Sequence, residues 1–364
     1  MLAYREFPMK TLRKIQVKGF KSIASTELML RDLNVVIGAN GSGKSNLIGV
    51  FRLLERVLSH NLQAYVASEP DRLLHHGRKT TPALSVDLAF DQNAYGFTLK
   101  AQQDTLIFGE ERVEYSGLWK YAEPIARGHK ESQLEEAAAS YKNEIPKHVF
   151  PKVRNLVVYH FHDTSDSSPA KQTADVEDNR QLRRDAGNLP AYLYWLKEKH
   201  PVQFRHIEEH IRLVAPFFDR FVLEPLKLNE RKIKLEWRQK QSDAYFDAFS
   251  LSDGTLRFIC LATLLLQPSP PELILLDEPE LGLHPFAIRV LAEMLEAVAR
   301  RSQVVVATQS VTLLNQFSPA DVIVAENDGM QSTFARVDEE KLKDWLKEFS
   351  IGELWEKNVL GGRP

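Results

Sequence analysis

The sequence predicts an α/β fold with a mixed sheet, an antiparallel β-rich sublobe and an inserted α/β lobe. Three observations predict it. An apolar run at 34–37 is followed by a glycine-rich loop and then by a segment with helical spacing of apolar residues. Two later apolar runs, at 272–276 and 303–307, each end in polar residues, and one amphipathic helix separates them. Because parallel strands need such a crossover, we expect these runs to lie side by side.

Length and composition describe an ordinary globular chain. With 364 residues, 43% hydrophobic and 26% charged, it can bury a substantial core in two or three lobes. A net charge of −2 neither requires nor excludes a nucleic-acid partner. The single cysteine, Cys260, excludes an internal disulfide, and its apolar surroundings predict core packing. No apolar run approaches the roughly 20 residues that span a bilayer, and the start, MLAYREFPMK, lacks the apolar core of a signal peptide. We therefore expect a cytoplasmic protein with no membrane partner.

The glycine-rich loop carries the first functional motif. Gly38, Gly43, Lys44 and Ser45 match the pattern GxxxxGKS, which cradles phosphate in nucleoside triphosphatases. Glycines let successive N–H groups converge on one anion, and the N-terminus of the following helix, expected at 46–58, adds positive potential. We therefore expect Lys44 to reach the β and γ phosphates and Ser45 to bind magnesium.

Periodicity predicts the remaining elements in chain order. They are antiparallel strands within 12–30 and 82–115, a polar helical stretch at about 116–150 with its clearest helix at 134–145, a buried strand at 153–161, an exposed loop at 164–185, two helices within 190–218 and strands within 221–239. The predicted domains are an N-terminal lobe with the phosphate loop at 1–110, an inserted and mostly helical lobe at 111–245 with a returning core strand near 153–161, a C-terminal lobe at 246–345 and a tail at 346–364.

Polar residues at the ends of the last two apolar runs complete the candidate site. The first run delivers Asp277 and Glu278 at its carboxyl end, where ligands of open α/β sheets bind. An acid there can hold magnesium, and its neighbour can polarise an attacking water. The second run ends in TQS, residues 308–310, which would face the γ phosphate from the same edge. Upstream, LSDGT at 251–255 forms a turn that opens an apolar helix.

In this order the motifs resemble the ATP-binding-cassette (ABC) ATPases, and among them the RecF, SMC and OLD-like group of DNA-maintenance and defence ATPases. The resemblance covers 12–110 and 245–330 well and the middle of the chain in outline. It implies an ABC-ATPase head with a P-loop NTPase fold, and ATP and Mg²⁺ as cofactors. The residues that carry it are FKS at 20–22, GANGSGKSN at 38–46, LSDGT at 251–255, LLDEPELGLHP at 275–285 and TQS at 308–310.

The resemblance also assigns roles to individual residues. It implies that Glu278 is the catalytic base, with Lys44 and Gln309 as further catalytic residues, and that Ser45 and Asp277 bind magnesium. LSDGT stands where the family has its signature sequence, which reaches the ATP held by a second subunit. ATP is therefore expected to join two copies head to head, and hydrolysis to release them. Residues implied to contact the nucleotide are Lys21, Ser22, Gly38, Asn40, Gly41, Ser42, Gly43, Lys44, Ser45, Asn46, Ser252, Gly254 and Thr255.

Two departures from the family pattern bear on the hydrolysis rate. Gln309 stands where family members usually place a histidine, and an amide cannot become cationic. The glutamine that many members carry between the first helix and the signature is not identifiable. Gln63 lies too close to the first helix, and His76 is a candidate stand-in. We therefore expect slow hydrolysis.

Three functions of such a switch stay open as alternatives. The first is a RecF-like or OLD-like ATPase in DNA repair or antiphage defence, acting on DNA or with a separately encoded nuclease or toxin. The second is a regulatory module that senses ATP or DNA and barely hydrolyses. The third, a transporter ATPase subunit, is disfavoured by FKS, by LHP at 283–285 and by the large insertion. Assembly as a homodimer or a higher oligomer is expected.

Other clusters are interpreted as structural. His160 and His162 have metal-ligand spacing on an expected strand, but no further ligand is evident, so packing or a role beside the nucleotide site is favoured. Basic clusters at 78–81, 181–185 and 229–240 fit solvated faces better than a DNA interface. Whether the tail at 346–364 docks on its own lobe or on a partner is left open.

Overall fold

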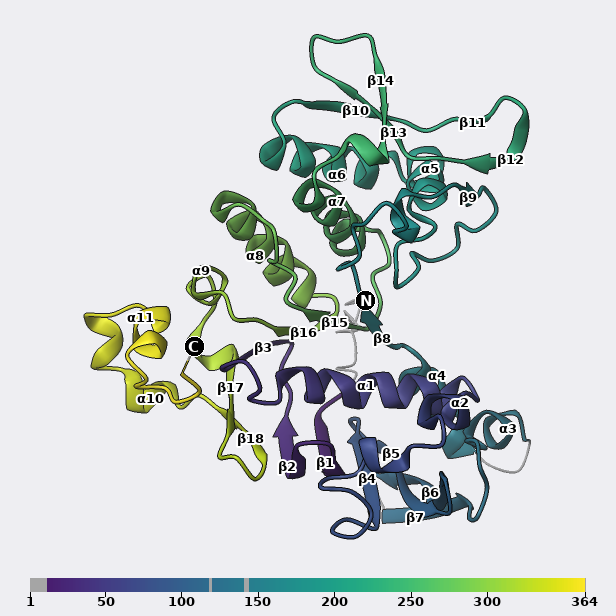
Figure 1. Ribbon diagram of the computed structural model, residues 1–364, viewed down its shortest axis with the longest axis vertical. Coiled ribbons are helices and arrows are strands. Elements are labelled where there is room, and N and C mark those ends of the chain that lie inside the picture. Colours follow the sequence, from purple (N-terminus) through teal and green to yellow (C-terminus); the bar gives the residue numbers. More distant parts are fainter. Residues whose placement is uncertain (1–11, 118–119, 141–143, 364) are drawn as a thin grey trace, which may run out of the picture.

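The computed structural model describes residues 12–117, 120–140 and 144–363 (Figure 1). The expectation about a signal peptide falls on residues 1–11, outside this part of the chain. Figure 1 shows a lower lobe with two sheets on either side of one long helix, and an upper lobe of helices and short strands. Among the described helices, none combines the length and the apolar character that a membrane span requires.

The central sheet has six strands in the order β18-β17-β3-β16-β15-β8. Neighbouring strands pair in parallel, except for the antiparallel pair of β17 and β18. The four buried strands predicted from apolar runs are confirmed, although β8 is short because a helix continues to Arg154. The strands are β3 (Leu33–Ile37), β8 (Leu156–Tyr159), β15 (Leu273–Asp277), β16 (Gln303–Ala307), β17 (Val322–Asn327) and β18 (Ser332–Arg336).

This sheet is buried on both faces, which explains its continuous apolar runs. Along β3, Val35 and Ile37 pack into one core, whereas Val36 packs into the other. The first core contains α7 (Asp253–Leu266) and α8 (Pro285–Ala299). The second contains α1 (Lys44–Leu58), which lies between the central sheet and an antiparallel sheet. The phosphate loop therefore joins a fully buried strand to a helix that is packed between two sheets.

The antiparallel sheet has the order β2-β1-β4-β5-β6-β7 and confirms the alternation seen in the sequence. Its last strand was not predicted, and the expected helical stretch at 116–150 is wrong there. β7 lies at the edge and is largely exposed, so its sequence lacks an apolar alternation and can contain Pro124. The strands are β1 (Lys14–Phe20), β2 (Ile23–Met29), β4 (Ala83–Ala89), β5 (Asn93–Gln102), β6 (Thr105–Ser116) and β7 (Lys120–Ala126).

Short helices complete the lower lobe. The helix expected at 134–145 ends early, because α3 stops at Ala139 and Ser140 is extended. The helices are α2 (Leu62–Val66), α3 (Leu134–Ala139), α4 (Glu144–Arg154) and α9 (Val311–Leu314), with 3-10 turns at Pro70–Arg72 and Pro319–Asp321.

The upper lobe holds the two helices and the short strands expected from the sequence. The strands form two three-stranded sheets, β10-β13-β14 and β11-β12-β9. The expected loop at 164–185 is irregular apart from a 3-10 turn at Pro169–Lys171 and the two residues of β9. The elements are α5 (Leu189–Lys199), α6 (Pro201–Val214), β9 (Ala174–Asp175), β10 (Phe218–Val222), β11 (Pro225–Leu226), β12 (Asn229–Ile233), β13 (Glu236–Gln239), β14 (Tyr245–Asp247) and a 3-10 turn at Ala248–Ser250.

The tail docks on its own lobe. Two short elements, α10 (Glu339–Leu342) and a 3-10 turn at Trp345–Lys347, lead into it, and it contains α11 (Ile351–Glu356). Trp355 is fully buried, and its indole N–H donates to the carbonyl of Gly362 at 2.5 Å. The N–H of Gly362 donates to a carboxylate oxygen of Glu326, at the end of β17, at 2.7 Å. These contacts settle the alternative that the sequence left open.

Candidate nucleotide-binding site

The phosphate loop has the backbone conformation that its glycines predict. Gly38 and Gly43 have φ angles of 152° and 108°, a region that favours glycine. Both are also packed too tightly for a side chain. A Cβ on Gly38 would collide with the carbonyl of Ala325, and one on Gly43 with the hydroxyl of Ser332. The loop is therefore held close to the neighbouring strands β17 and β18, and its N–H groups lead into α1.

Lys44 is buried at the first position of α1 and folds back over the loop. Its ammonium donates to the carbonyls of Gly38 and Ala39, at 2.5 and 2.9 Å. Burial lowers the pKa of Lys44, and three nearby carboxylates oppose that shift. The opposing carboxylates are Glu278, Asp277 and Glu280. Lys44 thus supplies a cation on the inner side of the loop, where a polyphosphate would lie.

Polar side chains support the loop from the antiparallel sheet and from β18. Asn46 donates to the hydroxyl of Ser22 at 2.7 Å, and the buried Ser332 donates to the same hydroxyl at 2.7 Å. The backbone N–H of Ser332 also donates to the carbonyl of Ser22 at 2.7 Å. Ser22 and Asn46 therefore brace the start of α1. Lys21 lies beside them, and burial, together with Arg52, lowers its pKa.

The predicted catalytic residues meet at the carboxyl ends of β15 and β16. The amide of Gln309 donates to Glu278 at 2.5 Å and to the side-chain oxygen of Asn40 at 2.8 Å. Glu278 has a φ of 43°, in the left-handed region that glutamate rarely adopts, and its N–H donates to the carbonyl of Ala307 at 2.7 Å. Such strain is found at functional sites where surrounding contacts hold it. Gln309 thus connects the phosphate loop to the candidate base.

A second glutamate, which the sequence analysis did not single out, fixes this turn. Glu280 is buried and accepts a hydrogen bond from the hydroxyl of Thr308. That hydroxyl in turn accepts the N–H of Ser310 at 2.9 Å. Burial raises the pKa of Glu280, and within the described residues its second carboxylate oxygen has no partner. In the sequence, only its position two residues after Glu278 indicates that Glu280 lies near the site.

Asp277 is paired with a cation that the sequence analysis also missed. A terminal nitrogen of Arg52, on α1, lies 3.6 Å from an Asp277 carboxylate oxygen. The Nε of Arg52 donates to His160 Nε2 at 3.1 Å. Burial raises the pKa of Asp277, and Arg52 opposes that shift. His160, one of the two histidines considered for a metal site, therefore acts through Arg52 beside the site.

His160 should make stability depend on pH. Burial, with help from Arg52, lowers its pKa to about 4 from an ordinary value near 6.5. As the pH falls below about 6.5, this histidine binds a proton in the unfolded chain, whereas folded His160 binds it only near pH 4. The free energy of unfolding therefore decreases as the pH falls from about 6.5 to about 4. We expect His160→Asn, which keeps an acceptor for Arg52, to lose less stability than the parent between pH 7 and 5. Urea unfolding at both pH values measures this, and equal losses would contradict it.

The residues present fit a magnesium ion. Ser45 is exposed at the start of α1, and within the described residues its hydroxyl makes no hydrogen bond. Asp277 ends the adjacent β15, and its side chain retains 14% exposure. Hydroxyl and carboxylate oxygens are suitable ligands for Mg²⁺, which otherwise keeps waters and phosphate oxygens. Among the described residues there is no group of three or more His, Cys, Asp or Glu side chains that could hold a metal ion, and His160 contacts Arg52.

The predicted signature lies at the start of α7. Ser252 is the N-cap of this helix, and its hydroxyl accepts the N–H of Thr255 at 3.2 Å. Gly254 packs against the carbonyl of Gly282, where a Cβ would collide. Ser252 is exposed, and among the described residues no hydrogen bond joins it or Thr255 to the phosphate loop. Within the described chain, the predicted signature therefore caps α7 and leaves Ser252 exposed.

Neither candidate for the missing glutamine reaches the acidic end of the site. Gln63 donates to the carbonyls of Leu106 and Lys130, so it ties α2 to the antiparallel sheet. His76 contacts the carbonyl of Met330 at 2.9 Å, at the turn between β17 and β18. Some residues of the basic clusters form ion pairs within the chain. They include Arg78–Asp71, Arg184–Glu55, Lys232–Asp175 and Lys234–Glu236.

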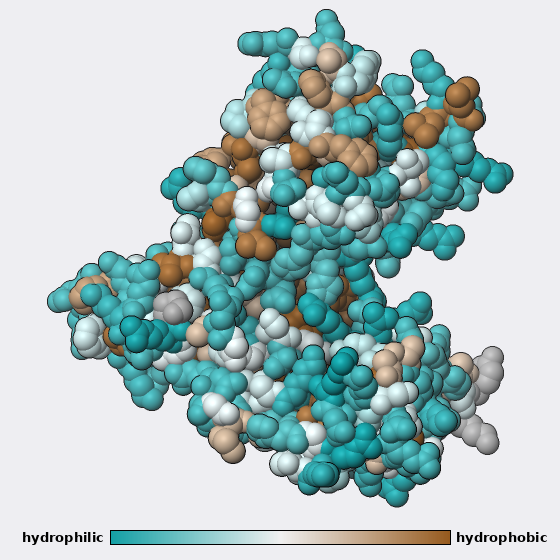
Figure 2. Space-filling view, viewed as in Figure 1, coloured by the Kyte–Doolittle hydropathy of each residue, from teal (hydrophilic) through white to brown (hydrophobic). Residues whose placement is uncertain are grey.

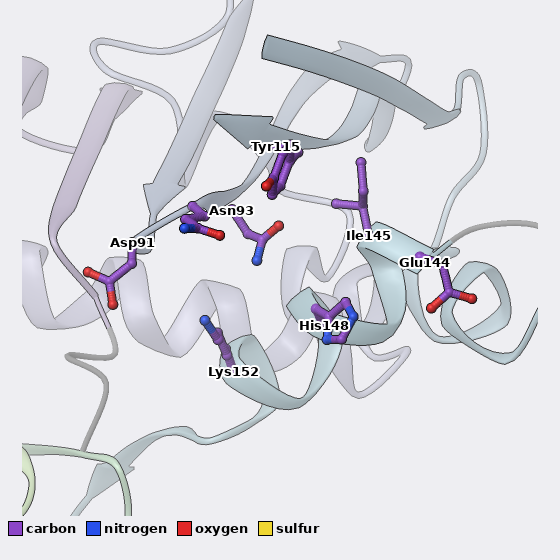
Figure 3. Close-up of a pocket in the computed structure, with 8 residues that line it drawn as sticks. Asp91, Asn93, Tyr115, Glu144, Ile145, His148 and Lys152 are labelled. Atoms are coloured by element: carbon purple, nitrogen blue, oxygen red, sulfur yellow. The ribbon is translucent and has the colours of Figure 1, made fainter. Parts of the chain in front are cut away.

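Among the cavities that described residues line, one borders the antiparallel sheet and another borders the phosphate loop. One of about 640 Å³ lies in the lower lobe between the antiparallel sheet and α4, where His148 and Lys152 face Asp91 and Asn93 across it (Figure 3). The other, of about 320 Å³, lies against the outer side of the phosphate loop and is lined by residues 39–42, the end of β17 and the tail, including Arg363. The tail therefore forms part of the wall beside the loop.

This fold and this site define a P-loop ATPase of the ABC and SMC-like group. The family described as "AAA domain, putative AbiEii toxin, Type IV TA system" matches residues 33–315. The chain therefore belongs to this family. The fold class expected from the sequence, an ABC-ATPase head with a mixed central sheet, is confirmed, and so is the resemblance to the RecF, SMC and OLD-like group.

Solved structures share this fold. An SMC head bound to the C-terminal winged-helix domain of ScpA has a TM-score of 0.60 at 17% identity, over 92% of this chain and 99% of that one. An SMC head from Pyrococcus furiosus, bound to the C-terminal domain of ScpA, has a TM-score of 0.56 at 15% identity, over 93% and 98%. These likenesses concern the fold.

Two curated proteins share part of the sequence. Urease accessory protein 2 of Cryptococcus neoformans is 30% identical over 185 residues, 49% of this chain and 15% of that protein. Structural maintenance of chromosomes protein 3 of Arabidopsis thaliana is 30% identical over 138 residues, 36% and 11%. The aligned part of this chain thus spans less than a sixth of the length of either relative.

Proposed function

We propose that this chain binds and slowly hydrolyses Mg·ATP, and that ATP joins two copies head to head as a reversible switch. The observation that carries the proposal is that the predicted signature is not bonded to the rest of the candidate site in the same chain. The phosphate loop, Asp277, Glu278 and Gln309 converge within one chain, whereas the exposed Ser252 is not bonded to them. A second copy could bring its own Ser252 to the open side of the nucleotide.

The surface around the signature supports a second copy as its partner. Leu281 and Phe286 are 50% and 41% exposed, and they flank Gly282, on which the signature packs. Figure 2 shows apolar side chains gathered over α8 and the upper lobe, while the visible face of the lower lobe is mostly hydrophilic. Burial of exposed apolar side chains favours association. ATP would add contacts that exist only when both copies are present.

The chemistry follows from the same residues. Lys44 and the loop N–H groups bind the phosphates, and Glu278 accepts a proton from the attacking water. Gln309, already bonded to Glu278 and Asn40, orients the base relative to the loop. Magnesium, held by Ser45 and Asp277, would screen the negative charge of the phosphates. Gln309 offers no cation for the developing charge, so turnover is expected to be slow.

The target of the switch is proposed to be DNA, a separately encoded nuclease or toxin, or both. The SMC heads with this fold were solved with ScpA bound, so a head of this shape can take a protein partner. The bond from Gln309 to Glu278 also favours a second candidate function, a regulatory module with little turnover, because it occupies an oxygen of the base. Turnover assays with and without duplex DNA separate the two candidates.

Ser252→Arg tests the sandwich directly. The larger cation should block closure of a second copy on the signature, so hydrolysis should fall roughly tenfold or more while Mg·ATP binding to a single chain persists. Ser25→Arg, at an exposed position of β2, is the matched control and should behave as the parent. Phosphate release and sedimentation velocity measure the effect. Unchanged hydrolysis and assembly in Ser252→Arg would refute the sandwich.

A further inference from the structure

We propose that Arg52 is the countercharge of Asp277 in the nucleotide-free protein and that magnesium must compete with it for this carboxylate. The inference rests on the proposed function, because it concerns the same Mg·nucleotide site. Arg52 is a positioning residue here, not a catalytic one. The contact between Arg52 and Asp277 would then depend on whether nucleotide and magnesium are bound.

The geometry of α1 puts both competitors on one side of the helix. Ser45 and Arg52 are seven residues apart, so they share the face that points to the carboxyl end of β15. Asp277 ends that strand, and Arg52 reaches it at 3.6 Å. Metal bound by Ser45 and the guanidinium extended from Arg52 would thus approach the same carboxylate from one face of α1, two helical turns apart.

The burial of Asp277 makes a countercharge necessary. Its side chain is 14% exposed, and that of Arg52 is 39% exposed. An ionised carboxylate with so little solvent needs a cation or hydrogen-bond donors nearby. Glu278 is adjacent and adds to the negative potential. When magnesium supplies two positive charges at this place, the guanidinium becomes a like-charged neighbour and its attraction to Asp277 is offset.

His160 holds Arg52 in position for this role. It accepts the Nε–H of Arg52 at 3.1 Å, so the histidine must be unprotonated at Nε2. The backbone N–H of His160 donates to the backbone carbonyl of Arg184 at 2.9 Å. The side chain of Arg184 forms an ion pair with Glu55, which lies one turn after Arg52 on α1. His160, the first residue after β8, therefore holds Arg52 in place, which gives a role to a histidine that the nucleotide-binding residues leave unexplained.

A magnesium titration tests the competition without using turnover. The unfolding temperature of the full chain is followed as Mg²⁺ is added at a fixed, saturating concentration of ADP. In Arg52→Gln, the Mg²⁺ concentration that gives half of the stabilisation should fall about three- to tenfold, the size expected for loss of one partly exposed charge. The unfolding temperature without Mg²⁺ should also fall, because Asp277 loses its partner.

Matched variants separate this effect from general damage. Arg56→Gln removes a guanidinium one turn later on α1, where it lies over the ring of Tyr65, and should leave the Mg²⁺ midpoint unchanged. Arg52→Lys keeps the charge and should return the midpoint toward the parent value. His160→Ala frees Arg52 and should shift the midpoint in the same direction by a smaller factor, which also covers the case in which Arg52→Gln fails to fold.

The outcomes distinguish this inference from the function on which it rests. If the parent shows no Mg²⁺-dependent stabilisation with ADP, the proposed nucleotide function is wrong. If the parent responds but neither Arg52→Gln nor His160→Ala lowers the midpoint, Arg52 does not compete with magnesium. A purely structural role for Arg52 would lower the unfolding temperature equally at every Mg²⁺ concentration and leave the midpoint in place.

Discussion

Lys44→Ala is expected to weaken Mg·ATP binding about 100-fold, because it removes charge-assisted hydrogen bonds to the phosphates. In the nucleotide-free chain the ammonium is held by the carbonyls of Gly38 and Ala39, on the concave side of the loop. It needs only to turn from these carbonyls to a phosphate, so its position is preorganised. Fluorescence anisotropy of a labelled ATP analogue in the presence of Mg²⁺ measures the loss.

The control for this change must remove a lysine of ordinary exposure. Lys18→Ala, on β1, does so and should bind nucleotide as the parent does. Because Lys44 also donates to the carbonyls of Gly38 and Ala39, Lys44→Ala should unfold at a lower temperature without nucleotide. Binding by folded Lys44→Ala within about threefold of the parent would show that the loop holds phosphate without its lysine, against the expectation from charge-assisted bonds.

The core of the fold was predictable because its signals are local. A strand that is buried on both faces is a nearly continuous apolar run, as β16 is at 303–307. The phosphate loop needs glycines at fixed positions. Both signals lie within a few consecutive residues. The strand β7 has no such signal, since an exposed edge strand needs no apolar alternation and tolerates Pro124.

The supporting residues of the site were not predictable for a different reason. Arg52 and His160 are 108 residues apart, and Glu280 meets Thr308 across 28 residues. Each is an ordinary polar residue in its own segment. Their role comes from parallel pairing of β8, β15 and β16, which brings the ends of three distant strands to one edge. Motif patterns therefore predicted Glu278 and Gln309, which meet at this edge, but not Arg52, His160, Glu280 and Thr308, which contact residues of the candidate site.

Gln309 illustrates how the structure refines an expectation from sequence. The sequence shows only that an amide replaces the usual histidine. In the structure this amide donates to both Glu278 and Asn40, so it links the strand end to the phosphate loop. Its two acceptors fix the side chain without a positive charge. This arrangement fits a site that keeps its geometry while hydrolysing slowly.

Glu278→Gln should separate ATP binding from hydrolysis. The substitution preserves side-chain volume and leaves the left-handed backbone at this position to the contacts that already hold it, including the N–H bond to Ala307. An amide cannot accept the proton of the attacking water, so turnover should fall about 100- to 10,000-fold, the usual contribution of a general base. Binding of Mg·ATP should persist, because Lys44 and the loop N–H groups are unchanged.

The same variant should accumulate the ATP-bound dimer, since hydrolysis would no longer release it. Sedimentation velocity with Mg·ATP should show two-chain particles for Glu278→Gln and a shift back to single chains with Mg·ADP. Glu293→Gln, an exposed glutamate on α8, is the matched control and should turn over as the parent does. If Glu278→Gln binds Mg·ATP but sediments only as single chains, nucleotide does not bridge two copies, and the exposed Ser252 needs another partner.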